Sequence, residues 1–162
     1  MGASQVPAAI AAGHPDTARA GLEILEEGGT AADAAVAAAL AACVAETVMS
    51  GLASGGHAIW WDAGERRALL LDCFVAVPGL GGKRTPSPLT PIEVPFGAQP
   101  IPYSVGIASC AVPGLPAGLG ELWRRFGSLP WSRLVEPALR LARAGTVMPA
   151  AHAACLAMLA PV

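Results

Sequence analysis

Charged side chains are scarce in this sequence of 162 residues. Asp, Glu, Lys and Arg make up 14% of it, whereas soluble domains usually carry about 25%. Hydrophobic residues reach 54%, and the mean hydropathy is +0.52. A chain of this composition either crosses a membrane or covers much of its surface with another part or partner.

A run long enough to cross a membrane is also missing. The longest uncharged helical stretch is 34–45 and consists mostly of Ala, whereas a spanning helix needs about 20 strongly apolar residues. Residues 1–12 carry neither Lys nor Arg and have only a short apolar stretch, unlike a signal peptide. We therefore predict no membrane association and a cytoplasmic location, with export of a longer parent protein left open.

The motifs that hold metals, nucleic acids and nucleotides are absent as well. The cysteines form no C-x-x-C pair, and no Cys/His cluster has the spacing of a zinc site. The net charge is −2 without a basic patch, which disfavours nucleic acid. The glycine turn 51–56 is not followed by the Lys-Ser/Thr of a P-loop. We predict no metal, no organic cofactor and no nucleic-acid partner.

Two helices are predicted near the N-terminus. Pro15 suits the first position of a helix over 14–27, which Gly28 can end. Thr30 and Asp33 then form a variant of the capping box at the start of a helix over 31–44. That second helix is apolar on every face, so it should lie in an interior.

The middle of the chain predicts strands. Residues 57–61 and 68–77 form a hairpin around turn residues 62–65, and the run Leu69-Leu70-Leu71 predicts burial of both its faces. Residues 78–102 hold seven prolines and four glycines, which predict a long irregular loop with edge strands at 92–96.

The last third predicts one more strand and three helices, without an internal repeat. The strand is expected over 103–111, and the helices over 115–126, 131–144 and 149–160. Together these elements describe residues 1–162 as a single incomplete domain with a Pro-rich loop at 78–102.

Short motifs in a fixed order carry a family resemblance. They are Gly13-His14-Pro15, Gly28-Gly29-Thr30-Ala31-Ala32-Asp33, Ser54-Gly55-Gly56, Leu71-Asp72, Val112-Pro113-Gly114 and Phe126-Gly127-Ser128-Leu129-Pro130-Trp131. Each motif alone is weak, but their shared order over roughly residues 12–149 is specific. The chain resembles the first part of the large subunit of the γ-glutamyltransferase (glutathione hydrolase) family.

This resemblance implies an α/β (α+β) fold, the αββα sandwich of N-terminal nucleophile hydrolases, of which this chain holds the N-terminal portion. Such enzymes cut themselves into two subunits, and the Thr that begins the small subunit attacks the substrate amide to form an acyl-enzyme. That Thr usually lies in a Thr-Thr-His context, which this sequence lacks. We therefore predict no catalytic residue here, inactivity of the chain alone, and the remainder of its own precursor as partner.

One departure from the family pattern concerns the substrate. Where the family has Asp-x-Arg-Glu, this chain has Asp72-Cys73-Phe74-Val75. The resemblance implies that the family's Arg clamps the α-carboxylate of a γ-glutamyl group, as a guanidinium fork can. Phe74 cannot do so. We predict that Phe74 and Asp72 are substrate-binding positions and that the substrate is a small-molecule amide with a different or less polar acyl group.

Three functions stay open at this point. The first is a γ-glutamyltransferase-type amidohydrolase or acyltransferase, and the second is an acylase of the same fold acting on non-glutamyl amides such as β-lactams. The third is a non-catalytic scaffold domain. Among the other polar residues, His14 and His57 are predicted to be structural, Cys73 to pack within its strand, and Asp72 either to cap a turn or to orient groups in a pocket.

Overall fold

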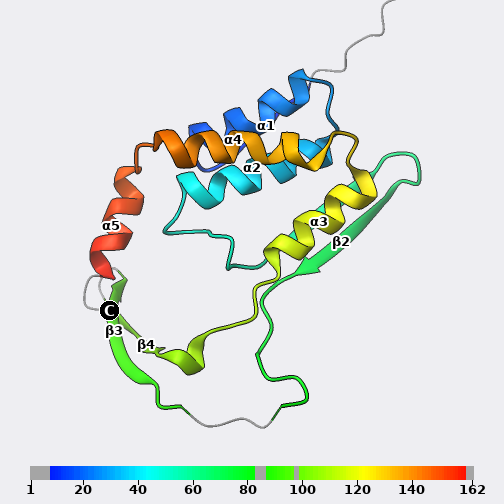
Figure 1. The fold of residues 1–162 in the computed structure, drawn as a ribbon. Helices are drawn as coiled ribbons and strands as arrows, with labels where there is room; N and C mark the ends of the chain where they lie inside the picture. Colours follow the sequence, from blue (N-terminus) through cyan, green and yellow to red (C-terminus); the bar gives the residue numbers. More distant parts are fainter. Residues whose placement is uncertain (1–7, 83–86, 97–98, 160–162) are drawn as a thin grey trace, which may run out of the picture. The chain divides into compact units, whose positions relative to one another are not determined.

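The computed structural model describes residues 8–82, 87–96 and 99–159 (Figure 1). Contacts divide the chain into two compact units. Unit 1 comprises residues 1–51 and 119–148, and unit 2 comprises residues 52–118 and 149–162. The helix over Leu115–Phe126 contributes residues to both units, and the single incomplete domain expected over 1–162 stays a prediction.

Unit 1 is helical, and its helices begin where the sequence predicts. It contains α1 (Pro15–Glu26), α2 (Ala31–Ala45), α4 (Trp131–Ala144) and the last part of α3 (Leu115–Phe126). The Nδ1 atom of His14 caps α1 by accepting a hydrogen bond from the Asp16 amide at 3.1 Å. Gly28 follows α1 with φ of 85°, a conformation that favours glycine. These predictions of helix boundaries are confirmed.

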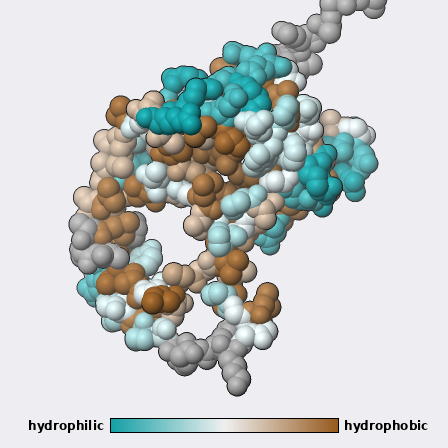
Figure 2. All heavy atoms as spheres, viewed as in Figure 1, coloured by the Kyte–Doolittle hydropathy of each residue, from teal (hydrophilic) through white to brown (hydrophobic). Residues whose placement is uncertain are grey.

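The core of unit 1 forms where α2 packs against α1 and α4. Ile24, Val36 and Leu134, one from each helix, have no exposed surface. Most of α2 is buried through small alanine side chains, which confirms the predicted interior position of this helix. Hydrophilic side chains gather over α1 on the visible face (Figure 2).

A buried carboxylate joins α2 to the loop that precedes α4. Asp33 is 0% exposed and completes the predicted capping box, because its Oδ2 accepts from the Thr30 amide at 2.9 Å. The same oxygen accepts from the amide and the hydroxyl of Ser128, each at 2.9 Å. A buried charge needs such partners. The capping box and the loop at Ser128, 95 residues apart, are therefore linked by hydrogen bonds to one carboxylate.

The first hairpin of unit 2 pairs β1 (Gly56–Asp62) with β2 (Arg67–Cys73). Only one of its faces is covered, since burial alternates along both strands. On the open face Ile59 is 77% exposed and Leu70 is 68% exposed. The predicted burial of both faces is therefore wrong within this chain. An apolar run indicates that both faces of a strand favour burial, but it does not show which residues bury them.

A second hairpin occupies much of the predicted Pro-rich loop 78–102. Here β3 (Thr90–Phe96) pairs with β4 (Gln99–Val105) in antiparallel register. The prediction of a long irregular loop is wrong for these strands, apart from the edge strand expected at 92–96. Proline is tolerated where the missing N–H would point away from the partner strand, and the prolines of both strands follow one alternation. They are Pro91, Pro95, Pro100 and Pro102.

Helix α5 (Ala150–Met158) packs on β3 within unit 2. Val94 of β3 is only 2% exposed, so it forms the buried centre of this small layer. The strand predicted over 103–111 instead ends at Val105, and a 3₁₀ turn, η1 (Ile107–Ser109), follows it. Gly106 separates the two with φ of 146°, a value that breaks a strand.

Candidate functional site

The two residues predicted to bind substrate lie where β2 ends. Asp72 is in the strand, and Phe74 follows its last residue. The Oδ1 atom of Asp72 accepts a hydrogen bond from the Phe74 amide at 3.0 Å. Such a bond from an Asp side chain to the backbone two residues later directs the chain out of the strand. Phe74 is 58% exposed, so it remains available for contact.

His57 joins these two residues into one cluster. It stands directly opposite Asp72 in the β1–β2 register, and its Nε2 lies 3.3 Å from Oδ1 of Asp72. Its ring stacks on that of Phe74 with centroids 5.5 Å apart and an interplanar angle of 12°. Sequence reasoning treated His57 as structural and did not predict these two contacts. Counting strand pairs outward from the turn after Asp62 would have matched His57 with Asp72.

Two glycines hold the backbone at Phe74. A Cβ on Gly55 would lie 2.5 Å from the Val75 nitrogen and 2.7 Å from the Phe74 carbonyl carbon. A Cβ on Gly114 would lie 2.4 Å from the Phe74 carbonyl oxygen. Real side chains cannot approach so closely, so both positions require glycine. The predicted glycine turn 51–56 therefore packs against the cluster's backbone.

Cys73 packs within the same layer, as predicted. Its thiol donates to the Gly56 carbonyl at 3.1 Å, and a Cβ on Gly118 of α3 would meet its Sγ at 2.3 Å. The thiol is therefore packed between the start of β1 and α3. Glycines at 114 and 118, one turn of α3 apart, allow this helix to approach the end of β2.

Three threonine hydroxyls of unit 1 form hydrogen bonds between segments of that unit. Thr17 donates to Oε1 of Glu46 at 2.8 Å, Thr30 to the Phe126 carbonyl at 2.8 Å, and Thr146 to Oδ2 of Asp16 at 2.6 Å. Each of these three hydrogen bonds joins two segments of unit 1 that are distant in the sequence. Among the described residues, no group of three or more His, Cys, Asp or Glu side chains could hold a metal ion.

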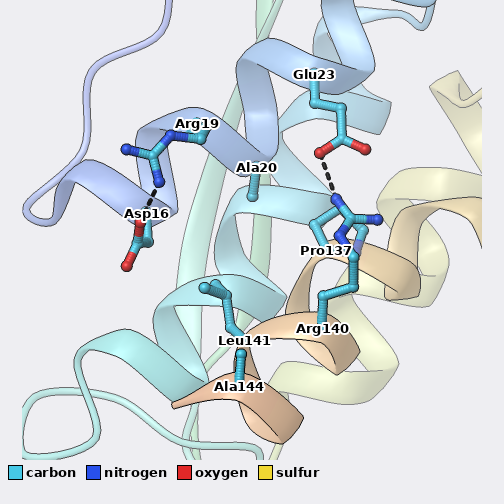
Figure 3. A pocket seen from close by; sticks show the side chains of 8 residues that line it. All are labelled: Asp16, Arg19, Ala20, Glu23, Pro137, Arg140, Leu141 and Ala144. Atoms are coloured by element: carbon cyan, nitrogen blue, oxygen red, sulfur yellow. Dashed lines mark hydrogen bonds and ion pairs between the residues drawn. The ribbon is translucent and has the colours of Figure 1, made fainter. Parts of the chain in front are cut away.

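Unit 1 also has a small pocket between α1 and α4, with a volume of about 200 Å³. Arg19 pairs with Asp16 there, and Arg140 pairs with Glu23 (Figure 3). Burial alone would raise the pKa of Glu23, but hydrogen bonds from Arg133 and Arg140 hold it below its usual value. All four charged lining residues are engaged in these ion pairs, so the pocket is explained by helix packing.

Comparisons with known proteins agree over nearly the whole chain. The sequence model described as gamma-glutamyltranspeptidase matches residues 17–160. Glutathione hydrolase 3 of Arabidopsis thaliana is 34% identical over 139 residues, which make up 86% of this chain and 20% of that protein. Acylase ACY 1 proenzyme of Pseudomonas sp. (strain SE83) is 35% identical over 145 residues, 86% of this chain and 25% of that protein.

A solved structure shows the same likeness in three dimensions. The gamma-glutamyltranspeptidase of Helicobacter pylori superposes with a TM-score of 0.74 at 26% identity, covering 96% of this chain and 43% of that one. The predicted α+β class and N-terminal nucleophile hydrolase fold are confirmed, with helices and antiparallel strand pairs as the portion present.

The matches also set the extent of the likeness. The chain spans about a fifth of the length of the curated relatives that it matches. No helix in the described ranges is long and apolar enough to cross a membrane. The roles of Phe74 and Asp72 in binding substrate stay predictions, now joined by the geometry of His57. The family is established: this chain belongs to the gamma-glutamyltranspeptidase family.

Proposed function

We propose that this chain is part of an amide-cleaving N-terminal nucleophile hydrolase whose acyl substrate is less polar than a γ-glutamyl group. The observation that carries the proposal is Phe74 at the position of the family's carboxylate-binding Arg. Phe74 is 58% exposed, and its ring is stacked on that of His57. The site therefore offers an aromatic face where the family pattern offers a guanidinium.

The free energy involved is large enough to change the substrate. Removing one partner of a buried charged pair costs about 2–5 kcal/mol, and every 1.4 kcal/mol is tenfold in binding. A γ-glutamyl group bound against Phe74 would leave its α-carboxylate without the guanidinium. An acyl group without that carboxylate loses nothing and gains apolar contact with the ring.

Chemistry requires groups beyond this chain. In the family mechanism a Thr hydroxyl attacks the amide carbonyl, the C–N bond breaks, and the amine leaves with a proton. Water, or an acceptor amine, then takes the acyl group from the resulting ester. We place that Thr in the remainder of the same precursor, which is the partner of this chain. The 162-residue chain alone is accordingly proposed to be inactive.

An acylase is the second candidate, and it is supported by the loss of the Arg together with the 35% identity to Acylase ACY 1 proenzyme. An acylase of this fold cleaves a side-chain amide whose acyl part need not be glutamyl. It uses the same mechanism with a different acyl pocket. Both candidates share this chemistry and a non-glutamyl acyl group, and the acylase reading adds that the amide is a side-chain amide.

A comparison of two chromogenic amides tests the proposal. The complete protein that contains this chain is assayed with γ-glutamyl-p-nitroanilide and with butyryl-p-nitroanilide, which lacks both the α-amine and the α-carboxylate. We expect a higher kcat/KM for the butyryl compound, and no release of nitroaniline by the 162-residue chain alone. A preference for the γ-glutamyl compound would contradict the proposed substrate. Cleavage of neither would favour a scaffold.

A further inference from the structure

The open face of the β1–β2 hairpin carries one polar pair on an apolar surface. Ile59, Trp61 and Leu70 are 77%, 59% and 68% exposed on that face. His57 and Asp72 lie on it as well, because side chains alternate along a strand. The stacked ring of Phe74 borders the pair. The surface is thus apolar except for the pair of His57 and Asp72, in which the carboxyl group of Asp72 is a hydrogen-bond acceptor.

Asp72 supplies the carboxyl group of this cluster. Its Oδ1 faces both the Phe74 amide at 3.0 Å and Nε2 of His57 at 3.3 Å. Its side chain is still 71% exposed, and a carboxylate has about four acceptor sites. Asp72 can therefore accept a further hydrogen bond from a ligand, whereas a carboxylate on the ligand would meet like charge.

We propose that His57, Asp72 and Phe74 form an acyl-recognition cluster that selects an acyl group with apolar surface and an N–H donor, and that disfavours one with a carboxylate. The inference rests on the proposed function, because it names the substrate class of the same site. It adds the preference for an ammonium or amide N–H, which follows from Asp72 and not from the loss of the Arg.

His57 is a positioning residue in this cluster. Its ring holds the Phe74 ring by stacking, and its Nε2 holds Oδ1 of Asp72. Two substitutions separate these contacts. His57→Gln keeps an N–H donor for Asp72 but removes the aromatic ring. His57→Phe keeps the ring but removes the donor, so Asp72 would retain only the Phe74 amide as a partner.

Four p-nitroanilides isolate the charges. The γ-glutamyl group carries an ammonium and a carboxylate, glutaryl only the carboxylate, 4-aminobutyryl only the ammonium, and butyryl neither. The complete protein is assayed with all four. We expect kcat/KM for 4-aminobutyryl to exceed that for glutaryl by at least about fivefold, the ratio given by one unit charge 4 Å away in water. The difference should appear mainly in KM.

Substitution of the cluster should change this ratio in a defined way. Asp72→Asn keeps the acceptor for the Phe74 amide but removes the charge, so the ratio should fall to about one. His57→Gln should leave it within about twofold of the wild type, and His57→Phe should raise it. A merely structural role would change the amount of active protein but not a ratio between two substrates.

Salt supplies a test that needs no variant. Raising the ionic strength from about 0.05 M to about 1 M should lower the wild-type ratio of kcat/KM for 4-aminobutyryl over glutaryl, because salt screens exposed charges. An unchanged ratio in Asp72→Asn would overturn the proposed role of the cluster, and so would a wild-type preference for glutaryl over 4-aminobutyryl. Cleavage of the butyryl compound would still support the proposed function in either case. Cleavage of none of the four amides would overturn both.

Discussion

The carboxylate of Asp33 accepts hydrogen bonds from the start of its own helix and from a loop 95 residues away. Replacing it with Asn keeps the shape but removes the charge that Thr30 and Ser128 surround. Hydrogen bonds to a charged group contribute about 1.5–3 kcal/mol each. We expect Asp33→Asn to lower the free energy of unfolding by about 2–3 kcal/mol, measured by urea denaturation of both proteins.

The pH dependence of that loss provides a second check. Burial alone would raise the pKa of Asp33, but hydrogen bonds from Thr30 and Ser128 hold it below its ordinary value of 3.8. A depressed folded-state pKa stabilises the fold fully above the unfolded value and loses this effect as the pH falls through the folded value. The difference between wild type and Asp33→Asn should therefore close at acid pH. A constant difference from pH 7 to acid would refute this origin.

At the residue scale, sequence patterns predict local contacts better than distant ones. The capping box of Thr30 and Asp33 was predictable because its partners are three residues apart. The hydrogen bonds that Ser128 donates to Asp33 were not predictable, since nothing in the sequence spacing brings these two residues together. His57 lies between these cases. Its pairing with Asp72 follows from strand register, but its stacking on Phe74 depends on how the chain leaves β2.

At the element scale, the approach of α3 to β2 depends on glycine. A Cβ on Gly118 would lie 2.3 Å from the Cβ and Sγ of Cys73, whereas one on Gly120 of the same helix meets nothing within 4 Å. Ala normally stabilises a helix relative to Gly by about 1 kcal/mol. We expect Gly120→Ala to raise the melting temperature slightly and Gly118→Ala to lower it.

A second substitution can test the cause. Cys73→Gly removes both atoms that the new methyl group would meet, so it should relieve most of the Gly118→Ala defect. It should not relieve Gly114→Ala, because that methyl group would meet the backbone oxygens of Cys73 and Phe74. Equal melting temperatures for Gly118→Ala and Gly120→Ala would contradict the predicted clash.

Ion pairs join α1 to α4 as well. Arg133 reaches Glu23 and Glu27 of the α1 segment and Glu136 on its own helix. Such surface pairs contribute little singly, but a network is worth more. We expect Arg133→Met to lower the free energy of unfolding by about 1 kcal/mol at low salt, with a smaller loss at high salt. Arg143→Met, on the exposed side of α4, should cost less and show little salt dependence.

The elements themselves were predictable to different degrees. Helices with periodic apolar positions, such as 115–126 and 131–144, match the structure at both ends. The hairpin of β3 and β4 was not predicted, because seven prolines in 78–102 suggested a loop. Proline removes only its own N–H, and the alternation of the prolines keeps the inward N–H groups available for pairing.

At the scale of the whole molecule, the composition agrees with a chain that other residues cover. Charged residues are 14% of the sequence, the open face of the β1–β2 hairpin is apolar, and the matched part makes up only 20% of the Arabidopsis relative. The fold class was predictable from the ordered motifs. The identity of the acyl group was not, because a lost Arg excludes one substrate without naming another.

Exchange of the residue at position 74 tests the central claim most directly. In the complete protein, Phe74→Arg restores the family's guanidinium, and Phe74→Leu serves as an apolar control. We expect Phe74→Arg to raise the ratio of kcat/KM for γ-glutamyl-p-nitroanilide over butyryl-p-nitroanilide by at least about tenfold, or 1.4 kcal/mol, and Phe74→Leu to leave it nearly unchanged. A wild-type protein that already prefers γ-glutamyl, or a ratio that Phe74→Arg does not change, would contradict the account.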